Sequence, residues 1–195
     1  MIRNIFALLA VNLFFASCLF AADKYIVDKV HSTVGFTVTH LVISTVPGHF
    51  QDYDVVFMYD ENDTSKSSVE ATIKTASIFT DNQKRDEHLR SADFFDAEKY
   101  PEITFKSNNF RKTDDGYVVK GILTMRGVSK EVEIPFKILG KVKDPGGNNK
   151  LGIEGNLTIN RQDYNVSWNK TLDTGGVVVS DDVKIELSIQ FQKEA

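Results

Sequence analysis

Cysteine is almost absent from this chain of 195 residues, and its single copy is Cys18. That residue falls inside an N-terminal segment with the pattern of an export signal, so residues 23–195 contain no cysteine. The sequence therefore excludes disulfides, thiol catalysis and thiolate metal sites from the rest of the chain. An exported domain of this kind depends on burial and hydrogen bonds, which a chain of this length can supply.

Clustered positive charge is also lacking. The formal net charge is −4, with 23 Lys and Arg against 27 Asp and Glu, and the two signs are interspersed along the chain. Binding to nucleic acid needs clustered lysines and arginines against the phosphates. The composition therefore argues against a nucleic-acid-binding protein.

Catalytic and nucleotide-binding motifs are missing as well. The sequence has no Gly-x-Ser-x-Gly elbow, phosphate loop, Rossmann glycine pattern or His-Glu-x-x-His. His31, His40 and His49 recur every nine residues, but on one unbroken strand an odd separation places neighbours on opposite faces. Pro47 and Gly48 break the path before His49. Because metal ligands must converge on one ion, we expect no metal site and no cofactor.

The first residues have the pattern of a secretory signal peptide. Arg3 supplies a positive start, residues 5–20 are mostly apolar, and two alanines precede Asp23. A retained membrane span would need about 20 apolar residues, and this run is shorter and interrupted by polar ones. The sequence therefore predicts a signal peptide at 1–22, one domain at 23–195, and no stable membrane span.

Cys18 leaves a second processing route open. Residues 16–18 loosely resemble a bacterial lipoprotein cleavage box, in which the cysteine would become the anchor. Phe15 fits poorly at the position where that box prefers an aliphatic residue, and the apolar run continues through 19–20. We therefore prefer cleavage near Ala22 to lipoprotein processing.

Apolar and polar residues alternate through most of the chain, and this period of two predicts β-strands. Turn clusters such as 114–116 and 144–147 predict antiparallel hairpins. About eight strands can close into a barrel that holds side chains or one small ligand, whereas a two-layer sandwich would show the same alternation. Gly35 and Gly121 fall inside two strands, where glycine often marks a bend or a close approach. The apolar stripes are Val34, Phe36, Val38; Val55, Phe57, Tyr59; Val69, Ala71, Ile73; Ile103, Phe105; Tyr117, Val119, Leu123, Met125; Val132, Ile134, Phe136, Ile138; Leu151, Ile153, Leu157, Ile159; and Val183, Ile185, Leu187, Ile189, Phe191.

One short helix interrupts the strands, around residues 81–92. Thr80 and Gln83 have the spacing of a capping box, which predicts that the helix begins at Thr80. Asp86 and Arg90 are four residues apart, so we expect them to form an ion pair on the helix surface.

The apolar face of this helix is narrow. Leu89, Ala92 and Phe95 form one thin stripe, which is typical of a helix docked on one side. Phe94 is adjacent to Phe95 and cannot share that stripe. We therefore expect Phe95 to pack inward and Phe94 to lie at a mouth of the barrel.

Arg161 follows an apolar run and stands close to aromatic residues, among them Trp168, the only tryptophan. An arginine at a strand end beside aromatics can hold an anionic or polar head group through its planar guanidinium. It can equally pair with Asp163 or another acidic neighbour, and both interpretations stay open. The valines at 177–179 are expected to line a mouth.

Four segments of the sequence resemble the YceI-like family of bacterial exported proteins. They are DKVHSTVGFTVTHLVISTVPGHF (28–50), KRDEHLRSADFFDAEKYPEITFKS (84–107), GILTMRGVSKEVEIPF (121–136) and INRQDYNV (159–166). The second segment is the most specific, and the resemblance covers essentially all of 23–195. Arg126 stands where relatives often carry histidine, and Tyr164 stands where phenylalanine is usual.

The resemblance implies an eight-stranded, lipocalin-like antiparallel barrel in the periplasm. Its interior would hold a long apolar molecule, polyisoprenoids or fatty amides being the ligand class associated with the family. Transport or a stress-related role without catalysis is implied. A long tail can bind with few polar contacts, because each buried methylene contributes about 0.8 kcal/mol. Ordinary core packing is the alternative for the apolar members of the expected ligand-contacting set, which is Phe36, Val38, His40, Phe50, Phe57, Phe94, Phe105, Leu123, Met125, Phe136, Ile159, Arg161 and Trp168.

Two other functions are compatible with the sequence. The first is an enzyme that acts on such a lipid inside the barrel, with His40, Arg161 or Asp163 transferring protons. The second is an accessory protein that docks on a membrane redox partner. A homodimer is compatible with each of these functions.

Overall fold

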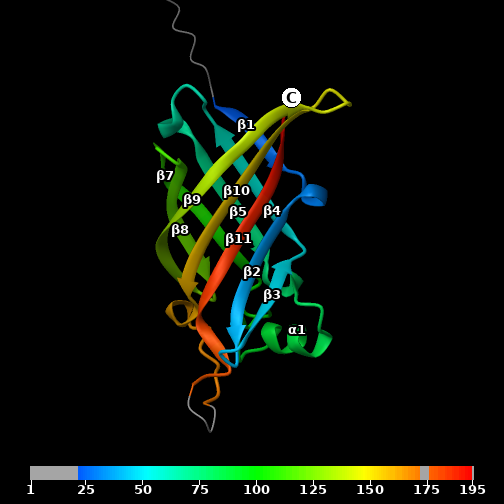
Figure 1. Ribbon diagram of the computed structural model, residues 1–195, viewed down its shortest axis with the longest axis vertical. Helices are drawn as coiled ribbons and strands as arrows, with labels where there is room; N and C mark the ends of the chain where they lie inside the picture. Colours follow the sequence, from blue (N-terminus) through cyan, green and yellow to red (C-terminus); the bar gives the residue numbers. More distant parts are fainter. Residues whose placement is uncertain (1–21, 172–175, 195) are drawn as a thin grey trace, which may run out of the picture.

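The alternating stripes form one antiparallel sheet that closes on itself (Figure 1). The computed structural model describes residues 22–171 and 176–194, so nearly all of the predicted signal peptide, including Cys18, lies outside the described residues. Within those ranges, eight strands pair in a closed ring that follows the chain order, which confirms the eight-stranded antiparallel barrel. The ring consists of β1 (Asp23–Val27), β4 (Tyr53–Tyr59), β5 (Ser68–Lys74), β7 (Glu102–Thr113), β8 (Gly116–Met125), β9 (Val128–Lys143), β10 (Asn149–Asn160) and β11 (Val179–Lys193).

Three further strands, β2 (Thr33–His40), β3 (Ser44–Phe50) and β6 (Ile78–Phe79), continue members of this ring toward one end of the barrel. One part of β11, residues 191–193, pairs with β1, and another part, residues 179–188, pairs with β2. β1 and β2 are therefore two pieces of one barrel strand. In the same way, β3 and β4 are two pieces of one barrel strand interrupted at residues 51–52. β5 and β6 are two pieces of another, interrupted at residues 75–77.

The ring opens at the end where the predicted helix lies. Helix α1 spans Gln83–Arg90, inside the predicted range 81–92, and packs beside β6 at the lower end of Figure 1. Among the described residues β6 pairs only with β3, so the helix lies where the ring lacks a strand. The short 3₁₀ helices are η1 (Lys29–His31), η2 (Thr64–Lys66), η3 (Thr75–Ser77) and η4 (Arg161–Tyr164).

The start of α1 differs from the prediction. Asn82 caps the helix, because its side-chain oxygen accepts a hydrogen bond from the backbone N–H of Arg85 at 3.0 Å. The predicted capping box at Thr80 is wrong. The hydroxyl of Thr80 donates instead to the buried carboxylate of Asp86 at 2.5 Å, and its backbone N–H donates to the same oxygen at 2.9 Å.

The predicted ion pair between Asp86 and Arg90 is also wrong, because each side chain has another partner. Arg90 donates from Nε to the backbone oxygen of Ala76 at 2.7 Å and from Nη2 to that of Ile78 at 2.9 Å. The arginine therefore holds the helix against the chain that leads into β6.

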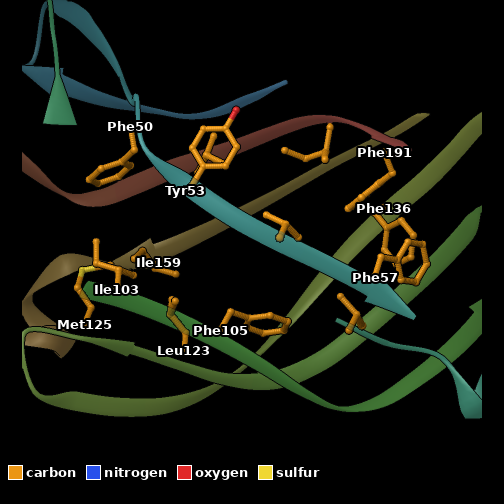
Figure 2. Close-up of a cluster of buried hydrophobic side chains, with 14 of the residues drawn as sticks. Phe50, Tyr53, Phe57, Ile103, Phe105, Leu123, Met125, Phe136, Ile159 and Phe191 are labelled. Carbon is orange, nitrogen blue, oxygen red and sulfur yellow. The ribbon is translucent and has the colours of Figure 1, made fainter. Parts of the chain in front are cut away.

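The end of the barrel opposite α1 is filled by aromatic rings. Phe57 is 1% exposed, and its ring centroid lies 5.2–6.5 Å from those of Tyr59, Phe110, Phe136 and Phe191. Figure 2 shows Phe57, Phe136 and Phe191 gathered at one end of the labelled side chains. This half of the interior is an ordinary packed core.

The break between β1 and β2 is held by Asp28. Its carboxylate accepts hydrogen bonds from Lys150 Nζ at 3.0 Å and from Gln190 Nε2 at 3.1 Å, and its backbone N–H donates to the oxygen of Gln190 at 2.8 Å. The side chains of Asp28 and Lys150 are only 16% and 12% exposed. The hydrogen bond from Lys150 lowers the pKa of Asp28 to about 2.

Gly121 lies where two strands approach closely. The pairing of β7 with β8 shifts register between Ser107 and Asn109, and a Cβ at Gly121 would lie 2.5 Å from the backbone oxygen of Lys106. The predicted close approach is confirmed there. Gly35 shows no such approach, because a Cβ at that position would lie 3.5 Å from its nearest neighbouring atom.

We expect Asp28→Asn to remove a pH-dependent part of the stability. The folded-state pKa of Asp28, about 2, lies below the ordinary value of 3.8, so folding favours the charged carboxylate. Its contribution is complete above about pH 5 and is lost as the pH falls through 4 toward 2. Denaturant unfolding of the native protein across this range should show a loss of about 1–2 kcal/mol that the variant does not show. Lys150→Met should flatten the profile in the same way, and parallel profiles for all three proteins would contradict this assignment.

We expect Gly121→Ala to lower the free energy of unfolding by about 1–3 kcal/mol, because the added methyl group meets backbone atoms that cannot move away. Gly35→Ala is the matched control, since its methyl group would make only ordinary contacts, and it should change the stability by less than about 1 kcal/mol. Thermal and denaturant unfolding measure both. Equal effects at the two glycines would show that space at Gly121 is not limiting.

Candidate functional site

Below the aromatic cluster the barrel is hollow. An outer cavity of about 360 Å³ lies at the α1 end, and a deep cavity of about 140 Å³ lies between it and the aromatic cluster. Phe36, Phe50, Met125 and Ile185 line both cavities, so the two spaces adjoin. Their combined size falls within the range of about 300–1,000 Å³ that is usual for small-molecule sites.

The deep cavity is apolar throughout. Every residue that lines it is aliphatic, aromatic, methionine or glycine, and they come from all sides of the barrel. The predicted residues Phe57, Phe105, Leu123 and Phe136 are among them, and Figure 2 shows Phe105 and Leu123 between Met125 and the aromatic cluster. Without any polar group in this lining, the deep cavity suits only a hydrocarbon chain or ring.

The outer cavity is lined by strand residues on one side and by loop residues on the other. The predicted residues Val38, His40, Phe94, Ile159 and Trp168 line it, as does Arg161, and Phe36, Phe50 and Met125 line it together with the deep cavity. The structure therefore brings every predicted ligand-contacting residue to the wall of one cavity or both. Their contact with a ligand stays a prediction.

Three rings form the wall of the outer cavity below α1. The ring centroids of His88, Phe94 and Trp168 lie 5.0–5.1 Å from one another, and His88 Nε2 is 2.8 Å from a carboxylate oxygen of Asp93. This hydrogen bond fixes the plane of the imidazole, so the aromatic wall is held in one position.

Phe95 packs inward against Phe50, as expected, and Phe94 lines the outer cavity at the α1 end; what does not hold is the helical spacing from which their separation was argued. The helix ends at Arg90, and the chain then runs through turns, so helical spacing no longer separates the two rings. Both line the outer cavity; Phe94 is 7% exposed, and Phe95 meets the ring of Phe50 edge-on at 6.2 Å.

Several residues of the outer cavity were not anticipated. Val183 and Ile185 belong to the apolar stripe of the last strand, so alternation alone could have identified them. Lys84 and His88 are four residues apart on α1, a spacing that places both on one helix face. Of the expected valines, Val178 and Val179 line the cavity, whereas residues 172–175 lie outside the described residues.

The polar side chains at the mouth of the cavity differ in whether they already have hydrogen-bond partners within the protein. Arg85 donates from Nε to the hydroxyl of Thr80 at 2.7 Å and from Nη2 to its backbone oxygen at 2.6 Å. Within the part of the chain that the structure describes, the side chains of Lys84 and His40 make no hydrogen bond or ion pair. Lys84 and His40 are therefore the groups best placed to meet a polar head group.

The guanidinium of Arg161 is saturated by protein atoms. It is 5% exposed and donates to the backbone oxygens of Ser180 at 2.9 Å, Val166 at 2.5 Å and Trp168 at 2.9 Å, and to Asp181 Oδ1 at 3.1 Å. Burial lowers its pKa, and the charge of Asp181 opposes that shift. Of the two interpretations of Arg161, these contacts favour internal pairing, with the chain around Trp168 held against the start of β11.

Asp163 is the wrong partner for Arg161 and lies away from the cavity. Its exposed carboxylate is 2.9 Å from Lys130 Nζ, and it lines neither cavity. The three proton-transfer groups of the enzyme hypothesis, His40, Arg161 and Asp163, are thus not brought together.

Arg126 joins two loops at the mouth. It donates from Nη2 to the backbone oxygen of Ala92 at 2.6 Å and from Nη1 to that of Asn165. The residue stands in the left-handed region, with φ of 47°, at the turn between β8 and β9. Its side chain therefore lies outside the cavity lining and ties the loop after α1 to η4.

Residues 22–171 and 176–194 show neither a cluster of metal ligands nor a membrane-spanning helix. No group of three His, Cys, Asp or Glu side chains there could hold a metal ion. None of the helices in these ranges combines the length and the apolar character that crossing a membrane requires.

Known proteins with a similar sequence or fold point to one family. The model of the YceI-like domain matches residues 25–191. A UPF0312 protein of Serratia proteamaculans is 40% identical over 172 residues, covering 87% of this chain and 86% of its own. The crystal structure of the YceI protein of Campylobacter jejuni is 36% identical with a TM-score of 0.70, covering 86% of this chain and 96% of its own.

A more distant structure shares the fold. It is a polyisoprenoid binding domain from Saccharophagus degradans implicated in plant cell wall breakdown, 12% identical, with a TM-score of 0.63. The match covers 89% of this chain and 99% of that domain. At this identity the likeness shows the fold alone.

We expect Arg161→Met to lower the free energy of unfolding by about 2–4 kcal/mol, because buried carbonyl groups and one carboxylate lose their donor. Arg111→Met is the matched control: Arg111 is half exposed, pairs with Glu133 on the outer face, and should contribute less than about 1 kcal/mol. Denaturant unfolding measures both. A small effect at Arg161 would show that its contacts do not hold the mouth together.

Proposed function

Since this chain belongs to the YceI-like family, we propose that it is a periplasmic binding or carrier protein for a long-chain lipid. The lipid is of the polyisoprenoid or fatty amide class and is held inside the barrel without being chemically changed. The observation that carries this proposal is the pair of adjoining cavities. The deep cavity is lined only by apolar residues, and polar groups line only the outer cavity, at the α1 end. The signal-peptide pattern of residues 1–22 supports the periplasmic location.

The arrangement of the two cavities suits a molecule with a long apolar tail. The outer cavity is the larger of the two, and the deep cavity is lined in part by Phe57 of the aromatic cluster. A hydrocarbon tail that enters past Trp168 would lose its contact with water over most of its length. Each methylene buried in this way contributes about 0.8 kcal/mol, so affinity grows with chain length until the tail meets the aromatic cluster.

The polar end of the lipid would remain at the mouth. His40 and Lys84 line that part of the outer cavity with their side chains unengaged within the described residues, whereas Arg161 is fully engaged. An imidazole accepts or donates a hydrogen bond, and an ammonium group attracts an anion. The head group would therefore be an alcohol, an amide or an anionic group.

The related domain from Saccharophagus degradans supports the polyisoprenoid part of this class. Its structure carries the description of a polyisoprenoid binding domain, and it shares the fold over 89% of this chain. An isoprenoid chain is branched and flexible, and the deep cavity offers only apolar side chains to such a molecule.

The proposal is tested by the lipid content of the protein. Protein exported through its own signal and purified without added ligand should release a long-chain lipid into organic solvent, identified by mass spectrometry. The delipidated protein should then take up geranylgeraniol. Repeated absence of any extracted lipid, together with no uptake, would remove lipid binding from consideration. Chemical conversion of the bound lipid would instead favour an enzyme.

We expect Ile185→Phe to weaken the binding of geranylgeraniol about ten-fold or more, because a larger ring at the junction of the cavities blocks the deep one. Geraniol, which is short enough for the outer cavity, should bind almost as before. Trp168 is the only tryptophan and lines the outer cavity, so its fluorescence reports occupancy.

Ile122→Phe is the matched control for this measurement. Ile122 lies on β8 but is 38% exposed and lines neither cavity. The control should bind both alcohols as the native protein does. Equal binding of geranylgeraniol by Ile185→Phe and Ile122→Phe would show that the tail does not pass the junction.

A further inference from the structure

We propose that the α1 end of the barrel docks on the surface of a lipid bilayer through an apolar tip, defined as Leu41, Val42 and Ile43 of the β2–β3 hairpin with Val177 beside it. The inference rests on the proposed function, because docking would serve the exchange of lipid between the barrel and the bilayer. Its evidence comes from side chains outside the cavity, so it can be tested separately.

The hairpin tip exposes large apolar side chains. Val42 is 66% exposed and Ile43 is 85% exposed, and Val177, on a neighbouring segment, is 37% exposed. Solvent normally disfavours such residues at a projecting turn, where glycine, asparagine and aspartate are usual.

The backbone of this turn is equally unfavourable for its residues. Leu41 has a φ of 53° and Val42 a φ of 65°, both in the left-handed region. A β-branched residue is rare there, and asparagine or glycine would adopt the same turn more easily. The sequence thus keeps apolar side chains at a position where neither solvation nor backbone geometry favours them, which points to a role for the side chains themselves.

The tip is continuous with the mouth of the cavity. The backbone N–H of Leu41 donates to the oxygen of Val178 at 2.9 Å, which holds the hairpin beside the segment that contains Val177. His40 and Val178, the residues next to the tip in the chain, line the outer cavity. In Figure 1 the hairpin and α1 lie at the same end, and β1 lies at the opposite one. A membrane under the tip would therefore face the opening through which a lipid enters.

Positive charge accompanies the apolar tip. Lys84 lines the outer cavity, and Lys170 is exposed beside Trp168, with its ammonium 6.0 Å from the ring centroid. Within the described ranges neither lysine forms an ion pair. Lysines next to apolar side chains are the combination that binds anionic membrane surfaces.

The size of the tip favours a bilayer over a protein partner. A stable protein interface buries about 800 Å² on each side and needs a broad complementary surface. Three or four side chains on a convex turn cover far less. A bilayer accepts a few apolar side chains without any complementary shape, so it is the partner that this surface fits.

Vesicle flotation tests the proposal. Purified protein with an intact cavity should float with vesicles of phosphatidylethanolamine and phosphatidylglycerol, and the double variant Val42→Asn with Ile43→Ser should bind at least about five-fold less. Asparagine suits the left-handed turn, so this variant should fold with an unchanged or higher Tm. Val177→Ser is a second variant that does not depend on the hairpin, and it should weaken binding about two-fold.

The matched control is Leu139→Ser with Val142→Ser. Leu139 and Val142 are 61% and 65% exposed on β9, away from the cavity mouth, so this control should float like the native protein. Equal flotation of the tip variant and the native protein, or no flotation of the native protein, would overturn the proposal. A native dimer that the tip variant dissociates would also overturn it, because the tip would then contact a second copy.

Uptake of geranylgeraniol from cyclodextrin separates this inference from the proposed function. The tip variant should bind that lipid as tightly as the native protein, because its cavity is unchanged. Lipid uptake without flotation of the native protein would contradict membrane docking alone. Flotation without any lipid uptake would contradict the proposed function alone.

Discussion

The pairing of β11 with two strand pieces at once is the constraint on which the rest of the structure depends. One part of β11 pairs with β1 and closes the ring, and the other part pairs with β2, which leads to β3 and β6. Because β6 has no further strand partner among the described residues, the barrel is closed at one end and open at the other. The aromatic cluster fills the closed end, and the cavities lie at the open end.

Buried polar groups hold the open end in shape through hydrogen bonds within the protein. Arg161 holds the chain around Trp168 to β11, and Asp86 accepts two hydrogen bonds from Thr80. Buried charges persist in proteins only where their hydrogen-bonding capacity is met. These groups meet it with backbone groups, with the hydroxyl of Thr80 and with the carboxylate of Asp181. The mouth thus has a fixed shape although it is built largely from loops and turns.

Most of the fold could be predicted because each strand has one face toward the interior, which imposes a period of two on the sequence. Whether that interior is packed or hollow could not be predicted, since Phe57 in the packed half and Phe36 in the hollow half occupy equivalent positions on their strands. The strand part of the cavity wall was predictable from the same stripes and from the resemblance to the YceI-like family, whereas Lys84 and His88 on α1 were not anticipated.

The errors concern contacts and element ends that local spacing does not reveal. Thr80 looks like a helix cap until Asp86 folds back onto it, and the acidic partner of Arg161 is Asp181 on the adjacent strand β11, not Asp163 nearby. The spacing argument applied to Phe94 and Phe95 fails because the helix ends at Arg90, and local spacing does not reveal where a short helix stops.

The two hydrogen bonds of Arg90 also bear on how the protein avoids self-association during folding. The carbonyl group of Ile78 belongs to β6, and that of Ala76 lies in η3 directly before it. One edge of β6 has no strand partner among the described residues, and such edges can recruit foreign strands into aggregates. The guanidinium of Arg90 donates a hydrogen bond to each of these carbonyl groups, and β6 is only two residues long. The helix thereby gives an open barrel the protection against edge-to-edge aggregation that a fully closed barrel has by its geometry.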